Sequence, residues 1–579
     1  MLDERNRANM SDPSDLLTIE EAASRLGVSI ATARRMAADG RIRGHKSGKQ
    51  WLIDGDSLAG KRRGRRGAAR PAIDWDASLK YVHNTDLSEV WVPDVLRHED
   101  LLASPDTVIA RARSIVERAA PGVARVVDVD QSPMLSRVGT LLELADRVAY
   151  QAVVGSFADR IDSQLSASVY SARLSTTEGY FTQQSRRQWV TWRRLVRSQL
   201  GETDQWLVKT DLTAFFETVP HSRLVAEVEA LNVEPAVVSP LREMLRLWGN
   251  DRNTGLPQGP NASRVLANLY MLPVDRAMLQ SGWSYSRFLD DVRVVVPTKS
   301  EGHRAIRQFQ RECRARGLLV STPKTKLLHG EEARDDVNAN RDLELADYLT
   351  SLPDSSAARK ALKRILRNAL KAEAGIDDRR ARFGLWRLTL LREAGTLNLV
   401  LGRLGDLAPV ASVVAAYLRP FITKKQVLDG LTAYLASDTE NHSSYLCTWL
   451  FAAMLEHPGC MPAPWADEAG RRVKNRNEPE FLRAIAAVVF LRSGRPADVD
   501  WVQADIQREH DPEVLRGYAV GLHFAHALDK TTQRHLATRS AATATAIQYL
   551  QGRNRLPSLV SKAGTIAVEA RMKQGGRRN

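Results

Sequence analysis

Residues 284–296 are Ser284-Tyr-Ser-Arg-Phe-Leu-Asp-Asp-Val-Arg-Val-Val-Val296. Two adjacent carboxylates, Asp290 and Asp291, stand between flanks that are rich in apolar and β-branched residues. This pattern predicts a β-hairpin with both acids at its turn. Two like charges so close together repel each other, and a divalent cation with oxygen ligands would remove that cost. The alternative is an ordinary surface turn, because Asp favours turns.

A third carboxylate follows another short apolar run. The run Trp206-Leu-Val-Lys-Thr predicts a strand that ends on Asp211, after which the chain turns into a helix. An acid at the end of a strand can face a neighbouring strand, so Asp211 can join the pair at the hairpin. Three carboxylates could hold two Mg²⁺ ions, or Mn²⁺ in their place. Such a pair of ions activates an attacking oxygen and stabilises a leaving oxygen.

Between these segments lies a loop rich in glycine and proline. Residues 255–262 are Gly-Leu-Pro-Gln-Gly-Pro-Asn-Ala, and a helix is expected to open at Ser263. Glycine lets the backbone approach a ligand closely. Taken alone, such a loop would be an ordinary turn before a helix.

In this order the three blocks resemble the palm motifs of reverse transcriptases. The family has Asp-x-x-x-Phe-Phe, then Leu-Pro-Gln-Gly-x-x-x-Ser, then an aromatic residue followed by x-Asp-Asp. The third block departs from the common form, since Phe288 stands where Tyr is usual and Leu289 follows it. The resemblance covers about residues 130–330. It implies an RNA-directed DNA polymerase, a nucleotidyltransferase that adds dNTPs, with right-hand fingers and a palm of antiparallel sheet and helices.

The resemblance also implies roles for single residues. Asp211, Asp290 and Asp291 match the catalytic, metal-binding carboxylates. Four further positions match nucleotide-binding residues: Phe216 as the aromatic that screens the sugar 2′ position, Gln258 near the incoming nucleotide and template, Lys324 near the triphosphate as a proton donor to pyrophosphate, and Arg173 on the triphosphate or template. Lys326 is the alternative to Lys324, and either lysine could instead be a solvated loop residue. Arg173 could instead be a solvated helix end.

Residues 16–58 predict a small DNA-binding unit. Thr18 and Glu21 have the spacing of a capping box, and a second helix from Ile30 to Ala38 would carry Arg34 and Arg35 outward. Two short strands then surround a basic turn that holds Lys46 and Lys49. The layout resembles excisionase and MerR-like winged helix-turn-helix domains, which place a helix in the major groove. A protein-binding helical module, or RNA as the ligand, stays open.

From about residue 341 to 560 the strand-like runs disappear and helical segments recur. The expected helices are 356–371, 379–393, 408–418, 425–435, 445–456, 478–493 and 512–526. Their spacing resembles a helical-repeat array of HEAT type. A palm followed by such an array resembles the abortive-infection and other defence-associated reverse transcriptases of bacteria, which implies antiphage defence. Some of those relatives synthesise DNA without an added template or start it on a protein hydroxyl, for which this chain offers Tyr417, Tyr434, Tyr445, Tyr518 and Tyr549.

Two other functions remain open. One is a retron-like or intron-like reverse transcriptase with a dedicated RNA, although no maturase or nuclease pattern accompanies the palm. The other is a catalytically silent DNA-binding regulator. Against a silent fold stands the complete set Asp211, Asp290 and Asp291, because converging carboxylates without a metal only cost stability.

Charge and composition agree with a nucleic-acid partner. The 579 residues have a formal net charge of +15, and residues 41–70 hold ten Lys and Arg against two Asp. We expect a multidomain α+β protein with a disordered segment 1–15, the helix-turn-helix domain 16–58, a basic linker 59–72, fingers and palm 73–340, the helical repeat 341–560 and a basic tail 561–579. Three scattered cysteines and no long apolar run predict a cytoplasmic protein without a membrane partner. The oligomeric state stays open, a homo-oligomer included.

Overall fold

The computed structural model describes residues 16–26, 30, 33–34, 37, 44–47, 50–54, 73–88, 90–132, 135–201, 204–339, 341–352, 355–371, 375–437 and 443–560. The expected disordered segment 1–15, basic linker 59–72 and basic tail 561–579 lie outside these residues. Contacts divide the chain into two compact units, one comprising the chain up to residue 72 with residues 176–178, the other comprising the rest. Each unit is described by itself.

The small unit has one described helix and a three-stranded antiparallel sheet of order β1-β3-β2. Helix α1 is Ile19–Leu26, and the strands are β1 Leu16–Thr18, β2 Gly44–Ser47 and β3 Gln50–Asp54. The capping box is formed, since the Glu21 amide donates to Thr18 Oγ1 and the Thr18 amide donates to a Glu21 carboxylate oxygen. The two strands expected after the second helix are present. Strand β1 was not expected, because it depends on pairing with the distant β3.

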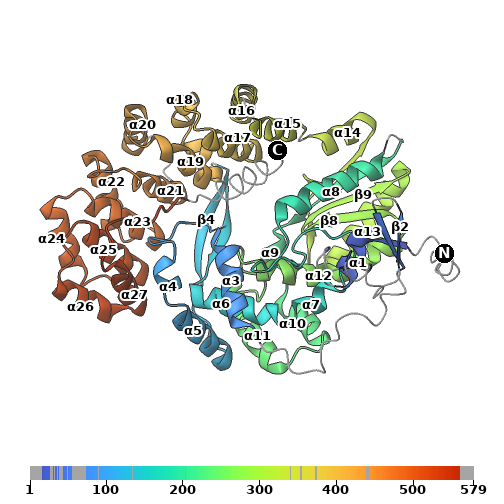
Figure 1. Cartoon of the computed structure of the whole chain (residues 1–579), viewed down its shortest axis with the longest axis horizontal. Helices are drawn as coiled ribbons and strands as arrows, with labels where there is room; N and C mark the ends of the chain where they lie inside the picture. Colours follow the sequence, from blue (N-terminus) through green and yellow to red (C-terminus); the bar gives the residue numbers. More distant parts are fainter. Residues whose placement is uncertain are drawn as a thin grey trace. The chain divides into compact units, whose positions relative to one another are not determined.

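The region expected to form the palm contains a four-stranded antiparallel sheet of order β11-β6-β9-β8. Strands β8 and β9 of this sheet are labelled in Figure 1. The four strands are β6 Trp206–Thr210, β8 Ser284–Phe288, β9 Asp291–Val296 and β11 Lys326–His329. Alternate side chains point to opposite faces of a strand. Val294 of β9 therefore joins the core beneath α12 (Asn261–Gln280) and α13 (Lys299–Ala315), whereas Val295 joins a second core with α8 (Ser185–Leu200). Helices cover both faces, which explains why β9 is an almost continuous apolar run.

A second hairpin, a pair of short strands and a set of helices complete the region 73–340, which was expected to form the fingers and palm. The hairpin is β4 Arg125–Ser132 with β5 Leu135–Leu141, and the short strands β7 Leu212–Thr213 and β10 Leu319–Val320 pair beside the palm. The other elements are α3 Trp75–Asn84, η4 Asp86–Ser88, α4 Glu99–Leu102, α5 Pro105–Arg118, α6 Leu144–Gly155, α7 Ala158–Asp162, α9 Phe215–Thr218, α10 His221–Ala230 and α11 Pro235–Trp248.

The rest of the larger unit is helical (Figure 1). All seven expected helices are present, with ends shifted by a few residues, and α14, α15, α18, α22, α24, α26 and α27 were not expected. The helices are α14 Gly330–Asn338, α15 Arg341–Thr350, α16 Ser356–Ala369, α17 Asp378–Leu390, α18 Leu397–Leu401, η5 Gly405–Val410, α19 Ala411–Leu418, η6 Arg419–Phe421, α20 Lys425–Ala436, α21 Ser444–Met454, α22 Ala463–Lys474, α23 Glu480–Leu491, α24 Pro496–Asp505, α25 Pro512–Phe524, α26 Lys530–Arg539 and α27 Ala541–Leu550.

The apolar core of this helical array does not stop at residue 340. Val92, Val95, Leu96, Val127 and Val129 belong to the same buried cluster as the helices from α15 onward. The segment that follows η4 and the β4–β5 hairpin are therefore built into the array. The domain limit at 340 stays a prediction, and the core shows that the two parts are not independent.

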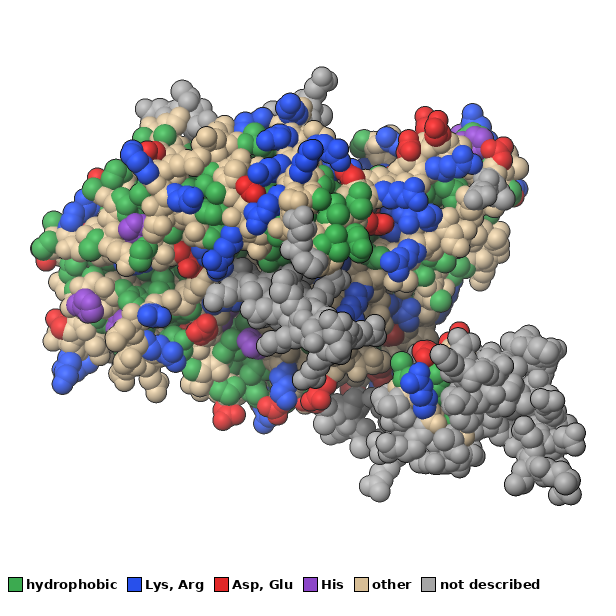
Figure 2. Space-filling view, turned by 45° about the horizontal axis from the view of Figure 1, so that its top comes forward, with side chains coloured by type: hydrophobic (Ala, Val, Ile, Leu, Met, Phe, Trp, Pro, Cys, Tyr) green, Lys and Arg blue, Asp and Glu red, His purple; other side chains and the backbone are tan. Residues whose placement is uncertain are grey.

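Lys and Arg side chains recur over the visible face of the larger unit, with fewer acidic side chains between them (Figure 2). This surface agrees with the excess of basic residues in the composition. Among the described helices, none has the length and apolar character needed to cross a membrane.

Candidate active site

Asp211 stands at the point where β6 passes into β7. Its backbone carbonyl accepts a hydrogen bond from the Ser321 amide (2.8 Å), which joins the edge strands β7 and β10 to the palm. The side chain is largely buried, and Lys324 Nζ lies 3.1 Å from its Oδ1. The structure thus places the two sequence-predicted residues, the acid and the lysine, in direct contact.

Asp290 occupies the turn of the β8–β9 hairpin, and Asp291 begins β9. Leu289 adopts a left-handed conformation (φ 59°) that lets the tight turn close. Below the turn, the fully buried Arg287 donates from its Nη1 to the Leu289 carbonyl (3.1 Å). The same guanidinium forms a bidentate pair with Asp275 (2.7 and 2.8 Å), so the turn rests on a fixed support.

The carboxylates influence each other electrostatically. Burial, with the charges of Asp211 and Asp291, raises the pKa of Asp290 to about 7. Burial also raises the pKa of Asp211, and the nearby Lys324 partly offsets this effect. Asp291 is more open, with Arg293 Nη1 3.9 Å from its Oδ1. The three acids are therefore mutually repulsive as they stand.

The three acids fit a divalent cation by their donor chemistry rather than by their present geometry. Within the described ranges, no group of three or more His, Cys, Asp or Glu side chains converges closely enough to hold a metal ion as it stands. The donor chemistry nevertheless fits, because Asp290 is a partly buried oxygen donor whose pKa is raised by burial and by two neighbouring negative charges. A divalent cation with oxygen ligands would relieve that repulsion.

The loop 255–260 lines the same cavity as Asp211 and Asp290, through Gln258 and Gly259. Gly255 (φ 106°) and Gly259 (φ 131°) adopt backbone conformations that residues with a side chain rarely adopt. Gln258 Nε2 donates to Glu217 Oε1 (3.2 Å), and the Gln258 amide donates to Thr140 Oγ1 (3.1 Å). The helix after the loop starts at Asn261, two residues before the expected Ser263.

The two phenylalanines of the first block differ in burial. Phe215 packs into the palm core, as expected, whereas Phe216 is only partly buried and faces the cavity beside Asp211. Their rings contact each other at 5.6 Å between centroids. The partly exposed ring is therefore the one that a nucleotide could meet.

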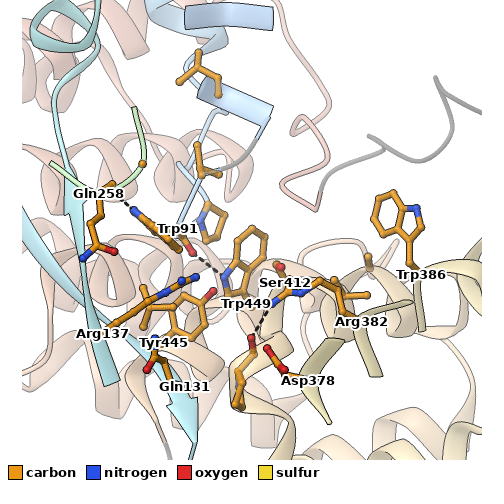
Figure 3. A pocket seen from close by; sticks show the side chains of 18 of the residues that line it. Trp91, Gln131, Arg137, Gln258, Asp378, Arg382, Trp386, Ser412, Tyr445 and Trp449 are labelled. Carbon is orange, nitrogen blue, oxygen red and sulfur yellow. Dashed lines mark hydrogen bonds between the residues drawn. The ribbon is translucent and has the colours of Figure 1, made fainter. Parts of the chain in front are cut away.

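A cavity of about 1920 Å³ joins the palm to the helical array. One wall carries Asp211, Phe216, Gln258, Asp290 and Lys324, and the other carries Asp378, Arg382, Trp386, Tyr445 and Trp449. Asp291 does not line it. Figure 3 shows Tyr445 beside Arg137, with Trp91 between Gln258 and Trp449. A space of this size, lined by acidic, basic and aromatic side chains, can accept a nucleic-acid strand together with a nucleotide.

Of the five candidate tyrosines, Tyr445 lines this cavity. The hydroxyls of three others are bonded elsewhere: Tyr417 contacts Thr396 and the Glu393 carbonyl, Tyr518 donates to Asp505, and Tyr549 donates to Glu99. Tyr434 lies in the core of the array.

Arg173 is not brought to the cavity. Its Nε donates to Asp162 Oδ1 (2.8 Å), and its Nη1 donates to the Ser166 carbonyl (3.1 Å). This guanidinium holds α7 to the following loop. Its nucleotide-binding role stays a prediction that these contacts do not favour.

In the small unit, Arg34 is exposed, and its Nη2 lies 3.7 Å from Glu20 Oε1. Lys46 belongs to β2. Arg35 and Lys49 lie outside the described residues, as does most of the expected second helix. The DNA-binding roles of these four residues stay predictions.

Sequence reasoning missed several residues that shape the site. Arg287 and Arg293 carried one signal, since each is a charged residue inside an apolar strand and must find a buried partner. Neither Glu217 nor Trp91 shows such a signal in the sequence. Their importance depends on Gln258, a residue far away along the chain.

Comparison with known protein families agrees with both motif-bearing regions. The model of the family "Reverse transcriptase (RNA-dependent DNA polymerase)" matches residues 159–361, and the model described as "Helix-turn-helix domain" matches residues 16–59. A search of curated proteins found no match to the chain. The chain therefore carries a reverse transcriptase domain and a helix-turn-helix domain, and both imply binding of nucleic acid.

Proposed function

We propose that this chain, an RNA-directed DNA polymerase by its reverse transcriptase domain, adds dNTPs by a two-metal mechanism at Asp211, Asp290 and Asp291. The observation that carries the proposal is the mutual repulsion of the three acids, since burial together with the charges of Asp211 and Asp291 raises the pKa of Asp290 to about 7. Two Mg²⁺ ions, or Mn²⁺, would supply the neutralising charge and the activation of the attacking hydroxyl.

The chain's own residues prepare the reaction. Arg287 holds the turn that presents Asp290, and Lys324, close to Asp211, is in reach of the triphosphate and donates a proton to the leaving pyrophosphate. Gln258, fixed by Glu217 and Thr140, positions the incoming nucleotide. Phe216 lies against the sugar and excludes a 2′-hydroxyl.

We further propose that the enzyme acts in bacterial antiphage defence. The support is the helical array, which follows the palm directly and forms one wall of the catalytic cavity. We propose that this array is of HEAT type. This plan resembles that of abortive-infection reverse transcriptases. Synthesis without an added template, or from a protein hydroxyl, is part of the proposal, and Tyr445 is the tyrosine best placed as a primer. The helix-turn-helix unit would bind DNA through Arg34, Arg35, Lys46 and Lys49.

The test is incorporation of labelled dNTPs by the purified protein with its bound nucleic acid and Mg²⁺. Asp290→Asn/Asp291→Asn should abolish incorporation while the melting temperature stays equal or rises, because the repulsion is removed. Equal incorporation by both proteins would refute the assignment of the site. Sequencing the product identifies the template, if one is used.

Two further measurements address the finer claims. The protein is denatured without proteinase treatment, and DNA that stays attached to it is measured. Attached DNA that is lost in Tyr445→Phe but not in Tyr434→Phe would support protein priming. Phage challenge of cells that carry the wild type or the double Asp variant tests the defence role, and unchanged protection would separate the chemistry from defence.

A further inference from the structure

A short segment between η4 and α4 connects the helical array to the loop 255–260, which we call the nucleotide loop. In this segment the indole N–H of Trp91 donates to the backbone carbonyl of Gln258 at 2.8 Å. The Arg137 guanidinium covers the indole ring at 4.7 Å. Trp91 thus contacts the loop directly at the residue assigned to nucleotide binding.

Two glycines make room for this indole. A Cβ atom at Gly259 would lie 3.1 Å from Trp91 Nε1, and a Cβ atom at Gly139 would lie 3.0 Å from the ring. The ring therefore lies so close to the backbone at both positions that a larger residue there would press against it. The indole is therefore wedged between the loop and strand β5.

The other side of Trp91 is held by the array. The indole N–H of Trp449, a buried residue of α21, donates to the Trp91 backbone carbonyl at 3.0 Å. Figure 3 shows the resulting line from Trp449 through Trp91 to Gln258. The continuation of the segment is anchored as well, because the buried Arg516 of α25 binds Asp94 (2.6 Å) and Asp100 (2.9 Å).

We propose that Trp91 and Trp449 are positioning residues for the polymerase reaction, through which the helical array fixes the backbone of Gln258. The inference rests on the nucleotide-binding role proposed for Gln258 and extends it to the array. The Gln258 carbonyl also accepts from the Thr140 amide (3.1 Å), so it keeps one partner when the indole is removed. Loss of the indole bond should therefore displace the loop rather than unfold it.

The first test measures amide hydrogen exchange in the full-length protein. Trp91→Phe and Trp449→Phe each remove one indole N–H and keep an aromatic ring. We expect faster exchange at the Thr140 and Gln258 amides, in peptides that cover 135–142 and 254–262. The matched control is Trp465→Phe, which removes an equally buried indole bond, to Thr432 Oγ1 (3.1 Å), inside the array. Exchange unchanged in the first two variants, or equally faster in the control, would overturn the proposal.

The second test measures steady-state kinetics of the same proteins. We expect the KM for dNTP to rise about 3- to 10-fold in Trp91→Phe, the factor that one neutral hydrogen bond carries, with kcat changed less than about twofold. Trp449→Phe should raise KM less, and the double variant should match Trp91→Phe, because Trp449 acts through Trp91. If the double variant raises KM by the product of the two single effects, or if only kcat falls, the proposal that Trp449 acts through Trp91 is wrong. If Gln258→Ala leaves KM unchanged, the role assigned to Gln258 fails, whereas the exchange data still report on the coupling.

Discussion

Arg287 and Asp275 form a bidentate ion pair in which both side chains are buried, directly beneath the turn that carries Asp290. Tyr285 also donates to Asp275 (2.7 Å), and Asn268 accepts from Arg287 (2.7 Å). A buried charge is tolerated only when it is paired and hydrogen-bonded in this way. The network therefore fixes β8, α12 and the catalytic turn as one body.

Arg287→Met should leave the charge of Asp275 unpaired in the core. We expect a loss of about 3–5 kcal/mol in the free energy of unfolding, together with lower activity because the Leu289 carbonyl loses its donor. Denaturant titration measures the first effect. Arg276→Met is the control, since this exposed neighbour bonds only Gln164 among the contacts seen (2.9 Å). Adding Asp275→Asn to Arg287→Met should restore part of the stability, and no recovery would contradict the account.

Lys324→Met should separate two roles of the lysine. Without a proton donor at the pyrophosphate, kcat should fall about 100-fold or more. The Mg²⁺ concentration for half-maximal rate should fall about 2- to 5-fold, because no ammonium then competes for Asp211. Lys326→Met is the matched control in the same segment. If Lys326→Met produces the loss of kcat instead, the proton donor is Lys326.

The parts of the site that could be predicted are those that local sequence determines. The hairpin at 284–296 and the strand that ends at Asp211 are each contained in a short window, so alternation and turn residues predicted them. The helices of the array were predicted for the same reason, although their ends shifted and shorter helices such as α18 were missed.

Trp91 shows why the rest could not be predicted. Its indole bonds Gln258, 167 positions along the chain, and its carbonyl bonds Trp449, 358 positions along. A single tryptophan in a loop carries no periodic signal for such partners. The same holds for Val92 and Val127, whose place in the core of the array follows from tertiary packing alone.

Gly259→Ala should disturb the nucleotide loop more than an ordinary glycine substitution would. The backbone has φ 131°, and the new Cβ would meet Trp91 Nε1 at 3.1 Å. We expect a loss of about 1–3 kcal/mol and a higher KM for dNTP. The control Gly282→Ala (φ 77°) adds its Cβ to open space, so it carries backbone strain without the contact. Thermal unfolding and dNTP titration compare the two, and equal effects on KM would argue against a wedged indole.

Asp146 predicts a pH dependence of stability that is separate from the catalytic acids. Burial raises the pKa of Asp146 to about 6, and the carboxylate accepts a hydrogen bond from the Gly122 amide (2.9 Å). In the unfolded chain an Asp titrates near about 3.9. Between these values the folded state keeps a proton that the unfolded state has released. The stabilising contribution is therefore complete below about pH 4 and is lost as the pH rises through about 6.

Asp146→Asn should remove this dependence, because the neutral amide still accepts from Gly122 through its oxygen. The variant should gain on the wild type as the pH rises from about 4 to 7, by up to about 3 kcal/mol for a shift of this size. Melting temperatures at a series of pH values measure the gain. Asp251→Asn, which removes a carboxylate from an exposed turn, is the control for the change in net charge. A constant difference between Asp146→Asn and wild type across this range would show that folding does not raise the pKa of Asp146.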